Sequence, residues 1–108
     1  MLDETKKLIR KFRDDRDFDK FHNGKDLAIS ISLEASELLE NYQWSQDDLE
    51  REDHLENIKE ELADILIYCE MFCDHYHLDQ DEIIKDKLIK NLKKYPEGKK
   101  IDLRNRRK

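Results

Sequence analysis

Glycine, proline and cysteine are scarce in this sequence: its 108 residues include two Gly, one Pro and two Cys. The scarcity of Gly and Pro disfavours tight β-hairpins and favours long helices. Two cysteines cannot build the dense disulfide framework of a small secreted domain. No apolar run approaches the ~20 residues that span a bilayer, and the N-terminal segment is too charged for a secretory signal. We therefore expect a cytoplasmic all-α protein without a membrane span.

Charge is distributed unevenly along the chain, whose formal net charge is −6. Residues 99–108 carry six basic side chains and one acidic one, a sum of +5, which leaves −11 for the first 98 residues. An acidic body repels phosphate unless cations intervene, so a nucleotide would have to arrive with metal. One alternative function is a non-catalytic helical adaptor whose basic tail binds nucleic acid. Because the acidic body would oppose close approach to DNA, we do not expect a nucleic-acid partner.

The helical spacing of apolar residues predicts four helices, over residues 3–17, 27–44, 53–77 and 79–94. An Asp is expected to cap three of these helices: Asp3, Asp26 and Asp79. Glu82, three residues after Asp79, completes a pattern like that of a capping box. The predicted domain covers residues 1–96, and the basic tail 97–108 is expected to be flexible. Because so short a chain buries only a modest core, we expect a homo-oligomer.

Acidic residues interrupt the apolar seams of the second and third helices. The seams consist of Leu27, Ile31, Glu34 and Leu38, and of Ile58, Glu61, Ile65, Tyr68 and Phe72. Each glutamate has a carboxylate three residues further on, Glu37 and Asp64, and residues three apart share a helix face. If the helices pack along these seams, up to four carboxylates converge in a poorly hydrated cleft. Unpaired charge in such a cleft costs several kcal/mol per ion, so a cation is required.

A hard divalent cation would neutralise this cluster, because neither seam contains Lys or Arg. Mg²⁺ prefers oxygen ligands and commonly bridges carboxylates to phosphates, and Mn²⁺ could replace it. A single pair of glutamates is common on solvated helix faces, but two pairs on two seams favour the metal interpretation. A structural zinc site is a competing interpretation, with the candidate ligands Cys69, Cys73, His75 and His77. The two cysteines also fit a helical core stripe, which is the simpler account.

The acidic segments Glu34-Ala35-Ser36-Glu37 and Glu61-Leu62-Ala63-Asp64 resemble the paired motifs of the MazG-like all-α nucleotide pyrophosphohydrolases. Other stretches resemble the branch of this family that contains dCTP pyrophosphatases. They are Phe12-Arg13-Asp14 through Arg16, Phe21-His22, 25–27, Tyr42-Gln43-Trp44, 64–68, and the closing Lys87, Asn91, Tyr95 and Pro96. Together they cover about residues 12–96 in the family's order. The resemblance implies a four-helix-bundle-like MazG-type fold, assembled as a dimer or tetramer.

The resemblance also implies hydrolysis of a (deoxy)nucleoside triphosphate to the monophosphate and pyrophosphate, in the house-cleaning of nucleotide pools. The implied catalytic residues and Mg²⁺ ligands are Glu34, Glu37, Glu61 and Asp64. One of them, or Glu60, would orient or deprotonate the attacking water. The implied substrate contacts are Phe18, His22, Lys25, Trp44, Tyr68, Lys87 and Asn91. Core packing is an alternative account of Trp44 and Tyr68.

Some positions depart from the family's pattern. Where relatives often have Trp, Pro and Asn, this chain has Phe18, Gly24 and Asp26. The resemblance therefore does not indicate which base and sugar the pocket prefers. The resemblance also implies a pocket completed by a second subunit. We hypothesise that Phe18 and Trp44 serve the pocket of the neighbouring subunit.

Overall fold

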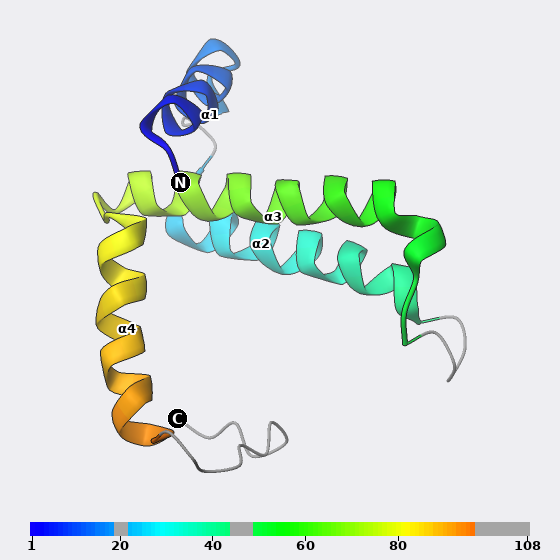
Figure 1. Ribbon diagram of the computed structural model, residues 1–108. Coiled ribbons are helices and arrows are strands. Elements are labelled where there is room, and N and C mark those ends of the chain that lie inside the picture. Colours follow the sequence, from blue (N-terminus) through cyan, green and yellow to red (C-terminus); the bar gives the residue numbers. More distant parts are fainter. Residues whose placement is uncertain (19–21, 44–48, 97–108) are drawn as a thin grey trace. The chain divides into compact units, whose positions relative to one another are not determined.

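The computed structural model describes residues 1–18, 22–43 and 49–96, and every regular element in these ranges is helical (Figure 1). The helices are α1 (Asp3–Asp15), α2 (Gly24–Leu39), α3 (Leu55–His75) and α4 (Gln80–Lys94), with 3₁₀ turns at Glu40–Tyr42 and Glu52–His54. The all-α prediction is confirmed. The chain divides into two compact units, Met1–Leu78 and Asp79–Lys108, and the predicted tail 97–108 lies outside the described residues. None of the described helices is long and apolar enough to cross a membrane.

The helix starts show how local side chains select the boundaries. Asn23 caps α2, because its side-chain oxygen accepts a hydrogen bond from the backbone N–H of Asp26 at 2.8 Å and its amide nitrogen donates to the Asp26 carboxylate at 2.9 Å. The predicted cap at Asp26 is therefore wrong. Asp3 is also not a cap but lies in the first turn of α1, where a negative charge favours the helix dipole. The predicted cap at Asp79 is confirmed, since its side chain accepts from the Glu82 N–H at 3.0 Å.

The first unit is built on the packing of α2 along α3, which lie side by side in Figure 1. Its core contains Leu27 of α2, which is 1% exposed, together with Met71 of α3 and Ile9 of α1. Burying a Leu side chain contributes about 1.5–3 kcal/mol. Cys73 is buried in the same unit, as expected for a core thiol. This packing places one face of α2 against one face of α3 along most of their lengths.

A buried amide holds the end of α2 to the start of α3. The side-chain oxygen of Asn41 accepts a hydrogen bond from the Asn57 amide at 2.9 Å and lies 3.1 Å from Nδ1 of His54. Because Arg51 can only donate, its contact of 2.7 Å with Nε2 of His54 places the imidazole proton on Nδ1, facing Asn41. The Asn41 amide donates to the backbone oxygen of Leu38, so this buried group is satisfied on both sides.

The C-terminus of α3 ends in a Schellman motif. The N–H of Leu78 donates to the carbonyl of Cys73 at 2.8 Å and the N–H of His77 to that of Asp74 at 3.2 Å. His77 has a φ of 56° at the position where glycine is usual. A residue with a Cβ is strained in this left-handed region, so the motif retains a small conformational cost.

Candidate functional site

Three acidic side chains meet where α2 faces α3. One carboxylate oxygen from each of Glu34, Glu61 and Asp64 lies within 4.8 Å of the other two. The spacing of three residues between Glu61 and Asp64 puts both on the face of α3 that packs against α2. Glu37 lies one turn beyond Glu34, and its carboxyl contributes to the raised pKa of both Glu34 and Glu61. The structure thus brings all four predicted carboxylates into one neighbourhood, which we call the acidic cluster.

The acidic cluster resists full ionisation. Burial, a hydrogen bond with Glu37 and the charges of Glu37, Asp64 and Glu61 raise the pKa of Glu34 to about 7. Burial and the hydrogen bond with Glu37 also raise the pKa of Glu61, with further contributions from the charges of Glu37, Asp64 and Glu40. Like charges held this close disfavour one another's ionised forms unless a cation neutralises them.

A divalent cation fits these donors. Oε2 of Glu34 is buried and has no hydrogen-bond partner. Among the described residues no Lys or Arg forms an ion pair with any member of the acidic cluster. A buried carboxylate oxygen without a proton donor or counter-ion is costly, whereas as a ligand to a hard cation it is satisfied. The donor set is oxygen alone, which suits Mg²⁺ or Mn²⁺.

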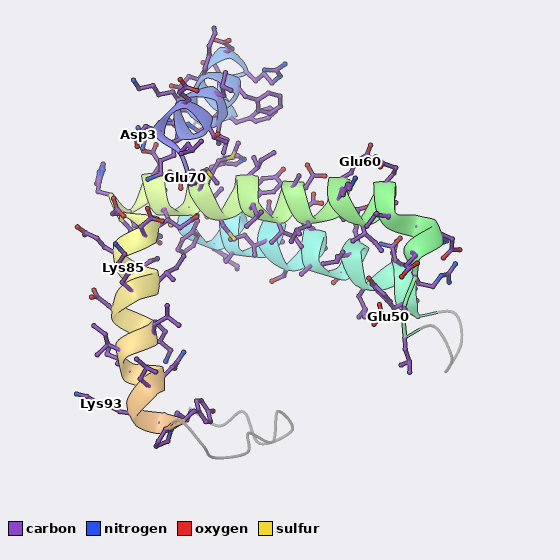
Figure 2. The ribbon with its side chains drawn as sticks, in the orientation of Figure 1. Asp3, Glu50, Glu60, Glu70, Lys85 and Lys93 are labelled. Atoms are coloured by element: carbon purple, nitrogen blue, oxygen red, sulfur yellow. The ribbon has the colours of Figure 1, made fainter. Side chains whose placement is uncertain are left out.

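Glu60, the other candidate to orient or deprotonate the attacking water, lies on a different side of α3 from the acidic cluster. It is exposed and projects from the side of α3 opposite α2 (Figure 2). A direct part for Glu60 at the acidic cluster is therefore not supported.

An apolar pocket of about 600 Å³ opens beside the acidic cluster. Glu34 and Asp64 are among its lining residues. Its other lining residues come from α1, from positions just before and after α1, and from α3. They are Met1, Thr5, Leu8, Ile9, Phe12, Phe18, Ala63, Leu66, Ile67, Tyr68 and Met71. Sequence reasoning assigned no such function to Ile9 or Phe12, because their helical spacing is equally typical of core residues. We refer to this cavity as the apolar pocket.

Three aromatic side chains line the apolar pocket, Phe12, Phe18 and Tyr68, and His22 lies beside two of them without lining it. The Phe18 ring lies 5.8 Å from the rings of both Phe12 and His22, and the His22 ring lies 6.3 Å from that of Tyr68. Burial, followed by the charges of Glu34 and other members of the acidic cluster, raises the pKa of Tyr68. Tyr68 is therefore neither a pure core residue nor a free surface ring, since it lines the cavity next to the carboxylates.

The remaining predicted substrate contacts are Lys25, Lys87, Asn91 and Trp44. Lys25 is exposed in the first turn of α2. Lys87 and Asn91 are one helical turn apart on α4, within the second unit, and their proposed contacts stay predictions. Trp44 lies outside the described residues.

The zinc interpretation finds no support in the geometry of its candidate ligands. Cys69 and Cys73 lie along α3, and burial raises the pKa of the Cys69 thiol, which opposes the thiolate that zinc requires. His75 and His77 are exposed at the helix end. In the part of the chain that the structure describes, the acidic cluster is the one place where three potential metal ligands of the types His, Cys, Asp and Glu converge.

Comparisons with known proteins support the fold and indicate its family. Residues 29–107 match the MazG-like family. The solved structure of a pyrophosphatase from Archaeoglobus fulgidus is 42% identical, covers 86% of this chain and 90% of its own, and superimposes with a TM-score of 0.77. The dCTP pyrophosphatase 1 proteins of Rattus norvegicus and Homo sapiens are each 28% identical over 88% of this chain. The chain spans 59% of the length of these two relatives.

Proposed function

The chain belongs to the MazG-like family, and we propose that it is a nucleoside triphosphate pyrophosphohydrolase that depends on Mg²⁺ or Mn²⁺. The observation that supports this most strongly is the buried, unpartnered oxygen of Glu34 within the acidic cluster, two members of which also line the apolar pocket. A cation at the carboxylates and a base in the pocket would place a triphosphate between them. The expected products are a nucleoside monophosphate and pyrophosphate.

In this proposal the acidic cluster holds the cation through Glu34, Glu37, Glu61 and Asp64. When bound, Mg²⁺ would neutralise phosphate charge and make a water molecule more acidic. The carboxylates keep the cation on the α2–α3 face, and one of them would orient the attacking water. Two carboxylates come from each helix, so the packing of α2 on α3 itself determines the spacing of the ligands.

We propose that the base occupies the apolar pocket. A cavity of about 600 Å³ lies within the range of typical ligand pockets, and its apolar lining excludes water from a flat base. Phe18 and Tyr68 would offer ring surfaces, and His22 lies against both. Lys25, and Lys87 with Asn91 on α4, are proposed to contact phosphate or sugar, and Trp44 is proposed to contribute a further ring.

The names of the relatives suggest the kind of substrate. Two are called dCTP pyrophosphatase 1, which supports testing deoxycytidine nucleotides first. A part in the house-cleaning of nucleotide pools and a cytoplasmic location stay predictions. So does the division into a domain over residues 1–96 and a basic tail.

We propose that the protein is a homo-oligomer, a dimer or a tetramer. Ile29 and Leu33 on α2, and Leu62 and Leu66 on α3, are 45–60% exposed, and the members of each pair are four residues apart. Two exposed apolar stripes on packed helices are typical of surfaces that a second subunit covers. Light scattering should give a mass of at least two chains, and Leu33→Glu should lower it. A monomeric wild-type protein would contradict this proposal.

The proposed activity is tested by pyrophosphate release from a panel of (d)NTPs with Mg²⁺. Glu61→Gln keeps the shape of a proposed ligand but removes its charge, and should lower the rate by at least about 100-fold. The matched control is Glu56→Gln on the same helix, whose side chain is 87% exposed and which should keep the wild-type rate. The proposal would be contradicted if the wild-type protein, shown by circular dichroism to be folded, released pyrophosphate from none of the nucleotides in the panel.

A further inference from the structure

We infer that Asp74 is a positioning residue for the nucleotide: through Arg10 and Arg13 it holds α1 against α3, so that α1 forms one wall of the apolar pocket. The inference rests on the proposed function for the nature of the ligand. It concerns two acidic side chains of α3, Glu70 and Asp74, that are separate from the acidic cluster.

The contacts form a clamp between two helices, which we call the arginine clamp. Oδ1 of Asp74 lies 3.1 Å from Nε of Arg10, and Oδ2 of Asp74 accepts a hydrogen bond from Nη1 of Arg13. Nη2 of Arg10 lies 3.9 Å from Oε1 of Glu70. Figure 2 shows Glu70 on the side of α3 that faces α1. One carboxylate thus bridges two arginines that are three residues apart on α1.

The arginine clamp is partly shielded from water, so it should contribute more to stability than an ion pair on the surface does. The side chains of Glu70, Arg13 and Asp74 are 3%, 15% and 26% exposed, whereas that of Arg10 is 44% exposed. Removing one partner from a shielded ionic contact leaves the others without their counter-charge, which costs more than the loss of an exposed pair. The charges therefore favour one register of α1 on α3.

Apolar contacts alone would hold α1 against α3 only weakly. Ile9 is the one described residue of α1 that is buried, while Leu8 is 68% and Phe12 is 45% exposed. A helix with a single buried side chain can shift or rotate at small cost in hydrophobic burial. The polar contacts at Arg10 and Arg13 add the directional constraint that Ile9 lacks.

A shift of α1 would reach the apolar pocket directly. Arg10 follows Ile9 and Arg13 follows Phe12 in the chain, and both Ile9 and Phe12 line the pocket. The acidic cluster lies on α2 and α3 and does not depend on α1 for its ligands. Loosening the clamp should therefore weaken binding of the base while the reaction at the phosphates stays intact, so KM rises and kcat is retained.

The experiment compares wild-type protein with Asp74→Asn, Arg10→Gln and the control Asp15→Asn. Asp15 pairs with Lys11 within α1 and is exposed, so its substitution removes a carboxylate without touching α3. Two quantities are measured: kcat and KM for Mg²⁺–dCTP, or for the best substrate of the panel, and hydrogen–deuterium exchange of the α1 amides. Circular dichroism checks that each variant is folded. If Asp74→Asn does not fold, Arg10→Gln tests the inference in its place, because it leaves the Arg13–Asp74 contact intact.

We expect Asp74→Asn to raise KM about tenfold with kcat within about twofold of wild type, and to speed exchange in α1 but not in the middle of α3. Arg10→Gln should give a smaller change in the same direction, and Asp15→Asn none. Unchanged KM, unchanged exchange in α1, or an equal loss of kcat would overturn the positioning role. A wild-type protein inactive on every nucleotide would instead overturn the proposed function, and exchange in α1 would then decide whether the clamp holds the helix.

Discussion

Replacing Glu34 with Gln should stabilise the metal-free protein at pH 8, although it removes a proposed metal ligand. Burial and neighbouring carboxylates raise the pKa of Glu34 from 4.5 to about 7. Ionisation is therefore less favourable in the folded protein than in the unfolded chain. A pKa change of this size corresponds to at most about 3 kcal/mol of the free energy of unfolding, and because Glu37 and Asp64 are exposed to screening solvent we expect about 1–2 kcal/mol.

The sign of the pH dependence follows from the direction of the shift. Well below pH 4.5 Glu34 is protonated in both states, so its ionisation costs no stability. Well above pH 7 it is ionised in both states, and the full cost of holding its charge in the folded protein applies. Between these values the wild-type protein should lose stability relative to Glu34→Gln as the pH rises. Mg²⁺ at pH 8 should restore stability to the wild-type protein, because the cation binds the folded carboxylates, and should do less for the variant.

The assay is urea denaturation followed by circular dichroism, at several pH values, with EDTA or with Mg²⁺. Glu56→Gln is the control, because its exposed side chain should give a difference from wild type that does not vary with pH. A Glu34→Gln protein that is less stable than wild type at pH 8 in EDTA would refute the reasoning. So would a difference between the two proteins that stays constant from pH 4.5 to pH 8.

Three further substitutions test the packing of the first unit by the same denaturation assay. Leu27→Ala should cost about 2–4 kcal/mol, because Leu27 is 1% exposed at the centre of the core; a loss below 1 kcal/mol would contradict this. Asn41→Ala should cost about 1–3 kcal/mol, since the proton donors of His54 and Asn57 lose their acceptor, and an unchanged midpoint would count against it. His77→Gly should instead gain up to about 1 kcal/mol by relieving a φ of 56°, so destabilisation would show that the strain argument is wrong.

Some helix boundaries were predictable from local sequence and others were not. The cap at Asp79 was found because its acidic partner, Glu82, comes three residues later. Asn23 followed by Asp26 carries the same signal at the same spacing, but the intervening Gly24 is a residue that usually disfavours a helix. Gly24 instead begins α2, close to Tyr76: a Cβ at this position would clash with the Tyr76 hydroxyl group. That close approach joins residues 52 positions apart, and local sequence does not contain it.

The sequence by itself determined the helices and the two acidic pairs, because helical periodicity puts residues three and four apart on one face whatever surrounds them. It therefore located the carboxylates of Glu34 and Glu61 on seams that should meet. Only the tertiary structure decided that an oxygen of Glu34 is buried without a partner, and that the apolar pocket lies next to it. Only the tertiary structure paired Arg10 and Arg13 with Asp74, since opposite charges at many positions of this highly charged chain could have paired equally well. Burial and ion pairing between helices depend on how the helices pack, which is a property of distant segments together and not of any one of them.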